Sequence, residues 1–135
     1  MNCTISYIST ASQHATESVV NDLLAFVEHE NNLKKVYGIL IYADGTFFQI
    51  IEGEEAIIKP LFNKILKDPR HHHVIKLLEK PSSKISFSKY HSSFTAINSA
   101  RSRGELEAFI NAEEHDQDEN FKRLAYVVNR LLKSA

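Results

Sequence analysis

The stretch VYGILIYADGTFFQII, residues 36–51, decides the fold expected for this chain. Residues 36–42 and 46–51 are rich in β-branched and aromatic side chains, which favour strands. The turn between them contains Asp44-Gly45, and Asp-Gly is the strongest short-range signal for a β-hairpin. The stretch therefore predicts two antiparallel strands that form the middle of a sheet.

The elements around this hairpin complete a small domain. Residues 4–8, TISYI, alternate as a half-buried strand does, and residues 15–29 carry apolar side chains at helical spacing. A second helical spacing begins at Ile57. There, Pro60 predicts a late start or a kink, because proline lacks an amide donor and clashes with the preceding turn.

Two further strands are expected after the second helix. They are residues 74–78 and 85–87, joined by turn residues at Pro81-Ser82-Ser83. The order β-α-β-β-α-β with one added strand is the split βαβ arrangement. It predicts an α+β, ferredoxin-like fold with two helices on one face of the sheet.

The C-terminal part of the chain has a separate helical pattern. Beyond Phe94, a polar stretch rich in serine and arginine interrupts the periodicity, which resumes as an apolar helical stripe over residues 121–132. We expect residues 1–95 to form the main domain. Residues 96–135 are expected to form a C-terminal helical extension that packs on the open sheet face or on a partner protein.

Bulk properties exclude several classes of function. The 135 residues suffice for one domain, and 16 basic residues against 17 acidic ones leave a net charge of −1. Such a chain lacks the global field that attracts nucleic acid or an anionic membrane. No apolar run is long enough to span a membrane, and the single cysteine, Cys3, excludes an internal disulfide. These properties indicate a cytoplasmic, unanchored protein.

Motifs for catalysis and metal binding are missing from the sequence. There is no glycine-rich phosphate loop, paired metal motif or nucleophile elbow, so no enzyme activity is expected. The run His71-His72-His73 does not predict a metal site, because adjacent residues of a strand point to opposite faces. A hydrolase of the acylphosphatase type is disfavoured, since residues 9–13 contain neither glycine nor arginine for an anion-binding loop.

One constellation of residues resembles a known family. The segments GILIYADGTFFQIIEG, residues 38–53, and DPRH, residues 68–71, occur with Tyr7 and Asn31 placed 42 and 18 positions before Gln49. In these segments and offsets the chain resembles BLUF domains, the sensors of blue light using flavin. The resemblance covers roughly residues 2–94.

The resemblance implies a photoreceptor that binds FAD noncovalently and signals to a protein partner of unknown identity. In such a protein, Tyr7 is the redox-active tyrosine, Gln49 the amide that switches its hydrogen bonds, and Asn31 the amide that holds the ring's polar edge. A carboxamide suits that edge because it both donates and accepts from one planar group. Candidates for contacts with the ribityl or phosphate groups are Lys64, Asp68, Arg70 and His71.

Several positions depart from the family's pattern. Tyr90 and Ser92 stand where the family usually has a tryptophan and a methionine, so the switch region on the fifth strand is altered. Glu30 and Tyr37 replace residue types common beside the flavin. These departures support an alternative, a degenerate BLUF-like domain that has lost flavin and acts as a light-independent protein-interaction module. The sequence also leaves open a homo-oligomer through the sheet face or the C-terminal helix.

Overall fold

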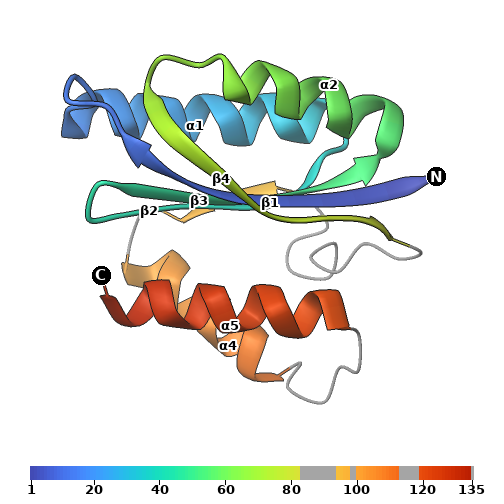
Figure 1. The fold of residues 1–135 in the computed structure, drawn as a ribbon. Coiled ribbons are helices and arrows are strands. Elements are labelled where there is room, and N and C mark those ends of the chain that lie inside the picture. The colour runs from blue at the N-terminus through green and yellow to red at the C-terminus, as the bar shows by residue number, and fades with distance from the viewer. Residues whose placement is uncertain (83–93, 98–99, 113–118, 135) are drawn as a thin grey trace.

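The computed structural model of the protein describes residues 1–82, 94–97, 100–112 and 119–134. Its elements are β1 (Asn2–Ala11), α1 (Glu17–Leu33), β2 (Tyr37–Ala43), β3 (Thr46–Glu54), α2 (Glu55–Leu66), β4 (His71–Ser82), β5 (Phe94–Ile97), α4 (Ala100–Ala112) and α5 (Glu119–Ser134). The strands form one sheet in the order β4-β1-β3-β2-β5. Helices α1 and α2 cover one face of this sheet, and α4 and α5 cover the other (Figure 1).

The pairing of the strands confirms the predicted ferredoxin-like α+β fold with an added fifth strand. β1 pairs with β3 and β4 in antiparallel orientation, and β2 pairs with β3 in the same way. The added strand β5 pairs with β2 in parallel orientation. As the hairpin pattern predicted, β3 lies in the centre of the sheet.

The hairpin between β2 and β3 closes as its sequence predicts. Ala43 and Thr46 are paired, and only Asp44 and Gly45 lie between them. Both turn residues have positive φ, 54° and 76°, which is the backbone of a type I′ turn. Glycine and aspartate adopt these angles at low cost, so the turn is determined locally.

One hydrophobic core fills the space between the sheet and the helices α1 and α2. The sheet contributes the alternate residues that face these helices, among them Tyr7, Leu40, Phe47 and Ile51. The helices contribute apolar residues of their inner faces: Val20, Leu24, Ile58 and Phe62. Complete burial of an Ile, Leu or Phe side chain stabilises the fold by about 1.5–3 kcal/mol.

A second core lies on the opposite face of the sheet. Ile39, Ile41, Phe48 and Ile50 of the hairpin pack against residues of α4 and α5, which are Leu106, Ile110, Leu124 and Val128. Because both faces are covered, β3 is buried at every position from Phe47 to Gly53 rather than at alternate positions. The division between domain and extension at residues 95 and 96 stays a prediction. Within the described ranges, no helix is long and apolar enough to cross a membrane.

The two inner helices differ from expectation at one end each. α1 continues to Leu33, beyond the apolar pattern of residues 15–29. The pattern did not predict this last turn because its buried side chain is the polar Asn31. The late start predicted for the second helix is wrong, since α2 begins at Glu55 and contains Pro60. Burial of Ile58 and Phe62 against the sheet outweighs the local cost of an interior proline, about 3 kcal/mol.

The later strands were predicted less well. β4 runs through Pro81 and Ser82, where a turn was expected, because an edge strand tolerates a residue without an amide donor. The predicted strand at residues 85–87 lies outside the described residues. The sequence pattern also missed the short β5 and the helix α4, in which only Leu106 and Ile110 among the described side chains are buried.

Candidate functional site

Tyr7 and Gln49 form a buried polar pair on neighbouring strands. They are register partners of β1 and β3, and paired residues of antiparallel strands project from the same face. Gln49 Nε2 donates a hydrogen bond to Tyr7 Oη at 3.2 Å. Only 3% of Tyr7 and 2% of Gln49 is exposed, so no bulk water competes for this contact.

The second polar atom of the Gln49 side chain is left without a protein partner. Gln49 Oε1 is buried and accepts no hydrogen bond from any residue that the structure describes. An unpaired buried acceptor costs about 1–3 kcal/mol. Rotating the amide by half a turn would let Oε1 accept a hydrogen bond from the Tyr7 hydroxyl and would leave Nε2 without a protein partner. In either orientation the protein satisfies one side of the amide, which leaves the other for a ligand.

A cavity of about 550 Å³ begins at Gln49 and extends between α1 and α2. Its lining residues on α1 are Phe26, Val27, Glu30, Asn31 and Lys34; those on and after α2 are Leu61, Lys64, Ile65, Lys67, Asp68, Pro69 and Arg70. A smaller cavity of about 50 Å³ shares Gln49 with it and continues to Tyr7 and His71. The larger volume lies within the range of small-molecule sites.

Asn31 enters this cavity from the last turn of α1. Its side chain is only 3% exposed, while its backbone oxygen accepts hydrogen bonds from the amides of Lys34 and Val36 at 3.2 Å and 2.9 Å. The backbone therefore ends the helix and begins the link to β2. The side-chain amide remains available to the cavity that it lines.

Basic side chains gather around the mouth of the cavity. Lys34, Lys64 and Lys67 are exposed there, and Lys34 lies 4.0 Å from Glu30. Arg70 is held by Asp68 through Nε at 2.9 Å and Nη2 at 2.6 Å. These charged hydrogen bonds lower the pKa of Asp68 below its ordinary value. The mouth therefore holds two oppositely charged pairs, Asp68–Arg70 and Glu30–Lys34, and two further cationic groups, Lys64 and Lys67.

His71 closes the inner end beside Tyr7. Its Nε2 lies 2.7 Å from the carbonyl oxygen of Ile65, and its Nδ1 lies 2.7 Å from Ser9 Oγ. A carbonyl only accepts, so Nε2 carries the proton and, in the neutral ring, Nδ1 accepts from the serine hydroxyl. The ring stands edge-on to Tyr7 with centroids 6.0 Å apart. Both ring nitrogens are thus engaged within the protein.

The Tyr7 hydroxyl holds its proton strongly. Burial raises the pKa of Tyr7 far above its ordinary value, and the carboxylate of Asp68 raises it further. The hydrogen bond from Gln49 acts in the opposite direction but is the smallest of the three influences. Tyr7 is therefore a neutral phenol at physiological pH, and ionisation inside this site requires a compensating change.

The sequence of residues 3–93 matches the family model BLUF, described as sensors of blue-light using FAD. The chain belongs to the BLUF family. The family match covers the strands and helices that carry Tyr7, Asn31 and Gln49. It is consistent with the offsets between these residues and with the ferredoxin-like fold.

Curated relatives and solved structures of BLUF proteins resemble the chain to different extents. The blue light- and temperature-regulated antirepressor BluF of Escherichia coli is 30% identical over 78 residues, 58% of this chain and 19% of that protein. The photoactivated adenylate cyclase subunit alpha of Euglena gracilis is 32% identical over 91 residues, 64% of this chain and 9% of that protein. The chain thus spans less than two thirds of either relative.

Two structures extend the likeness to nearly the whole fold. BlsA in its photo-activated state is 27% identical with a TM-score of 0.66, covering 98% of this chain and 95% of that one. The BlrP1 BLUF structure has a TM-score of 0.71 at 24% identity, covering 95% of this chain and 90% of that one. The second likeness concerns the fold alone.

The predicted site residues of this BLUF domain are only partly brought together. Tyr7, Asn31, Gln49 and the candidates Lys64, Asp68, Arg70 and His71 line the two connected cavities. Tyr90 and Ser92, predicted for the switch region, lie outside the described residues. Lys34 was missed, although it follows Asn31 by three positions and therefore shares its helix face.

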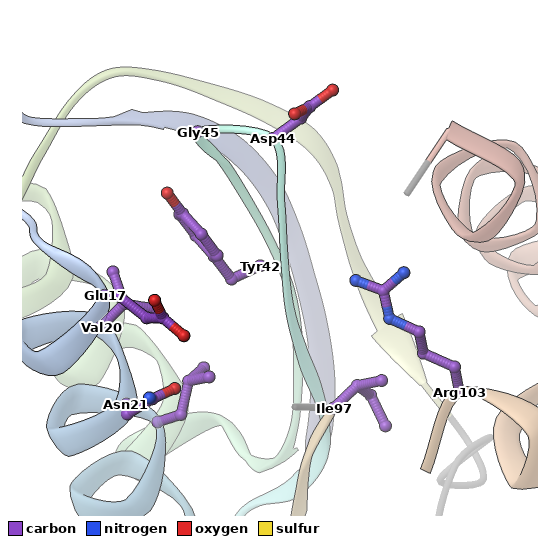
Figure 2. Close-up of a pocket in the computed structure, with 9 residues that line it drawn as sticks. Glu17, Val20, Asn21, Tyr42, Asp44, Gly45, Ile97 and Arg103 are labelled. Carbon is purple, nitrogen blue, oxygen red and sulfur yellow. The ribbon is translucent and has the colours of Figure 1, made fainter. Parts of the chain in front are cut away.

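A further cavity of about 500 Å³ lies apart from this set, where the start of α1, the β2–β3 turn, β5 and α4 approach one another (Figure 2). Its polar lining residues include Glu17, Asn21, Tyr42, Asp44 and Arg103. It contains none of the residues predicted for flavin binding. No group of three or more His, Cys, Asp or Glu residues suited to a metal ion occurs among the described residues.

Proposed function

We propose that this protein is a blue-light photoreceptor that holds FAD noncovalently in the cavity between α1 and α2. The observation that carries the proposal is the buried Tyr7–Gln49 pair, whose amide has one polar atom without a protein partner at the edge of that cavity. Most buried side-chain polar atoms in proteins have a hydrogen-bond partner, so the unpaired amide atom at the edge of this cavity supports a ligand there.

The residues present fit a flavin. Its ring carries acceptors and one N–H donor along a single edge, and the amides of Asn31 and Gln49 supply both kinds of partner. Val27, Leu61 and Ile65 offer apolar contacts for the flat faces of the ring. Basic groups at the mouth, Lys34, Lys64 and Lys67, suit phosphate oxygens, which supports a flavin nucleotide over unphosphorylated riboflavin.

In this proposal the protein supplies position and proton control. The flavin, when bound, supplies light absorption and an electron-accepting ring. Tyr7, a neutral phenol with its pKa raised by burial, would supply an electron and its proton to the bound flavin. Gln49, 3.2 Å from the hydroxyl, is the group that exchanges donor for acceptor by rotation or tautomerisation.

The switch of one amide is a small energetic event. A net change of one buried hydrogen bond amounts to about 1 kcal/mol, so an output requires an element already near balance between two packings. We infer that this output passes to a protein partner rather than to a substrate. The relatives whose names include an antirepressor and cyclase subunits support such signalling. We also propose that the protein is located in the cytoplasm, because its single cysteine, Cys3, is free and buried, which suits a reducing compartment.

The test is the visible spectrum of the purified full chain, supplemented with FAD and recorded before and after blue light. We expect a flavin spectrum that shifts reversibly to longer wavelength in the wild type and in the control Tyr37→Phe. Tyr37 is a half-buried tyrosine of β2 that, contrary to the expectation from the family pattern, lines neither cavity. The shift should be absent in Tyr7→Phe and Gln49→Ala. A folded chain that takes up no FAD would contradict the proposal and favour a light-independent interaction module.

A further inference from the structure

Two polar side chains of α1 bind the backbone of β5 outside the candidate flavin site. Glu28 Oε2 accepts a hydrogen bond from the amide of Ala96 at 2.7 Å. Asn32 Oδ1 accepts from the amide of Phe94 at 2.7 Å, and Asn32 Nδ2 donates to the Phe94 carbonyl oxygen at 3.1 Å. Because they are four positions apart, Glu28 and Asn32 lie on the same face of the helix.

These hydrogen bonds occupy the outer edge of a very short strand. β5 has four residues, pairs with β2 on one side, and is the last strand of the sheet that the structure describes. Its residues Phe94 and Ala96 are 1% and 5% exposed, so water does not satisfy their outward backbone groups. Unpaired backbone groups at such depth are costly. The two side chains of α1 therefore take the place of a neighbouring strand.

β5 also connects the two hydrophobic cores. Phe94 and Ala96 belong to the core that contains Tyr7, whereas Ile97 belongs to the core formed with α4 and α5. The next described element after β5 is α4, which begins at Ala100. A displacement of β5 would therefore move residues of both cores at once.

Apolar packing between α1 and β5 does not extend along the whole length of β5. The cavity of about 500 Å³ in Figure 2 lies between the first turns of α1, which carry Glu17 and Asn21, and the end of β5 at Ile97. At that end apolar contact between helix and strand is incomplete. Attachment is concentrated at the other end of α1, where Glu28 and Asn32 make their hydrogen bonds.

We propose that Glu28 and Asn32 are positioning residues that clamp β5 to α1 and couple the flavin cavity to α4 and α5. Asn31, the neighbour of Asn32 in the same helical turn, lines the cavity. If a change in the contacts of Asn31 shifts this helical turn, the cavity lining and the clamp therefore move together. The coupling rests on the proposed photoreceptor function, whereas the clamp itself does not.

Amide hydrogen exchange of the full chain in the dark tests the clamp. Asn32→Ala removes both bonds to Phe94, and Asn32→Asp keeps only the acceptor. We expect the amide of Phe94 to exchange about fivefold faster or more in Asn32→Ala, the factor for one net hydrogen bond, and less so in Asn32→Asp. The matched control is Asn21→Ala, an exposed amide on the same helix. Equal exchange in Asn32→Ala and Asn21→Ala would overturn the clamp.

The hydrogen bond of Glu28 is tested by comparing a variant that removes the acceptor with a conservative variant that keeps it. Glu28→Leu removes the acceptor for the amide of Ala96 and should accelerate its exchange about fivefold or more, whereas Glu28→Gln keeps an oxygen acceptor and should behave as the wild type. If Glu28→Gln and Glu28→Leu accelerate exchange equally, the geometry of the hydrogen bond is not what holds β5, and the clamp is overturned.

The coupling is tested on the FAD-loaded protein under blue light. We expect light to change the exchange of amides in α4 or α5 of the wild type, and this change to disappear in Asn32→Ala while the spectral shift persists. A change that persists in Asn32→Ala would refute the coupling but leave the photoreceptor function intact. Failure of the wild type to take up FAD would refute the photoreceptor function and the coupling, while the exchange in the dark still decides the clamp.

Discussion

The hydrogen bond between Tyr7 and Gln49 predicts a specific pattern of stability in the flavin-free chain. Tyr7→Phe leaves the whole Gln49 amide buried without a protein partner, and Gln49→Leu leaves the Tyr7 hydroxyl in the same condition. The double variant removes both polar groups. Removing one partner of a buried pair costs about 1–3 kcal/mol, whereas replacing both by apolar groups of similar shape is nearly neutral.

Because the double variant is nearly neutral, the expected coupling energy between the two positions equals the sum of the two single costs, about 2–6 kcal/mol. The double variant should be at least as stable as the wild type, since it also eliminates the unpaired Gln49 Oε1. The assay is urea unfolding without flavin, followed by circular dichroism, for the wild type, both single variants and the double variant. A parallel cycle that combines Tyr37→Phe with Gln49→Leu should be additive. Tyr37 is two positions from Ile39 in β2 and therefore lies on the same face of the sheet as Ile39, opposite to Tyr7.

The result that would refute this reasoning is additivity of Tyr7→Phe and Gln49→Leu within about 0.5 kcal/mol, the value expected for independent sites. Saturating FAD provides a second check. Ligand that binds only the folded state adds stability according to its concentration relative to its dissociation constant. FAD should therefore stabilise the wild type more than the double variant, reversing their order. Equal stabilisation of both proteins would show that the Gln49 amide does not contact the ligand.

Three further predictions follow from single contacts. The raised pKa of Tyr7 keeps its hydroxyl protonated in the folded state at a pH where the unfolded state ionises, so the free energy of unfolding should fall as the pH rises above about 10. This slope, measured by urea unfolding at several pH values, should be smaller in Tyr7→Phe, and an unchanged slope would contradict the prediction. Gly38→Ala places a Cβ 1.9 Å from a backbone oxygen of β3 and should cost about 3 kcal/mol or more in urea unfolding, whereas Gly104→Ala on α4 meets nothing and should be neutral or slightly stabilising; similar costs would refute the close approach. Lys64→Gln should weaken binding of FAD about two- to fivefold in a fluorescence titration without weakening riboflavin, and Lys122→Gln should change neither; equal loss for both flavins would argue against a phosphate contact.

Local sequence patterns were sufficient for the central part of the fold. The Asp44-Gly45 turn requires two positive φ values that these residues adopt at low cost, so the hairpin and its register could be read from the chain. The proximity of Tyr7 and Gln49 was implied by the resemblance to the BLUF family. The register of β1 and β3 then places the two side chains on one face of the sheet.

Features that depend on distant partners were not readable in the same way. β5 is four residues long and owes its position to β2 and to the side chains of Glu28 and Asn32, more than 60 positions earlier in the chain. α4 was missed because its described buried side chains are few, and Pro81 continues β4 because that strand lies at an edge. None of these partners can be identified from a local window.

The chain by itself determined the elements with strong local signals, the ferredoxin-like order, and the candidate residues Tyr7, Asn31 and Gln49. Only the tertiary structure showed that one atom of the Gln49 amide lacks a protein partner and that Gln49 lines a cavity of about 550 Å³. It also showed that side chains of α1 hydrogen-bond to the backbone of β5. The physical reason is that turn angles and amphipathic periodicity are properties of neighbouring residues. Cavities, unpaired groups and edge contacts arise only when segments far apart in the sequence are packed together.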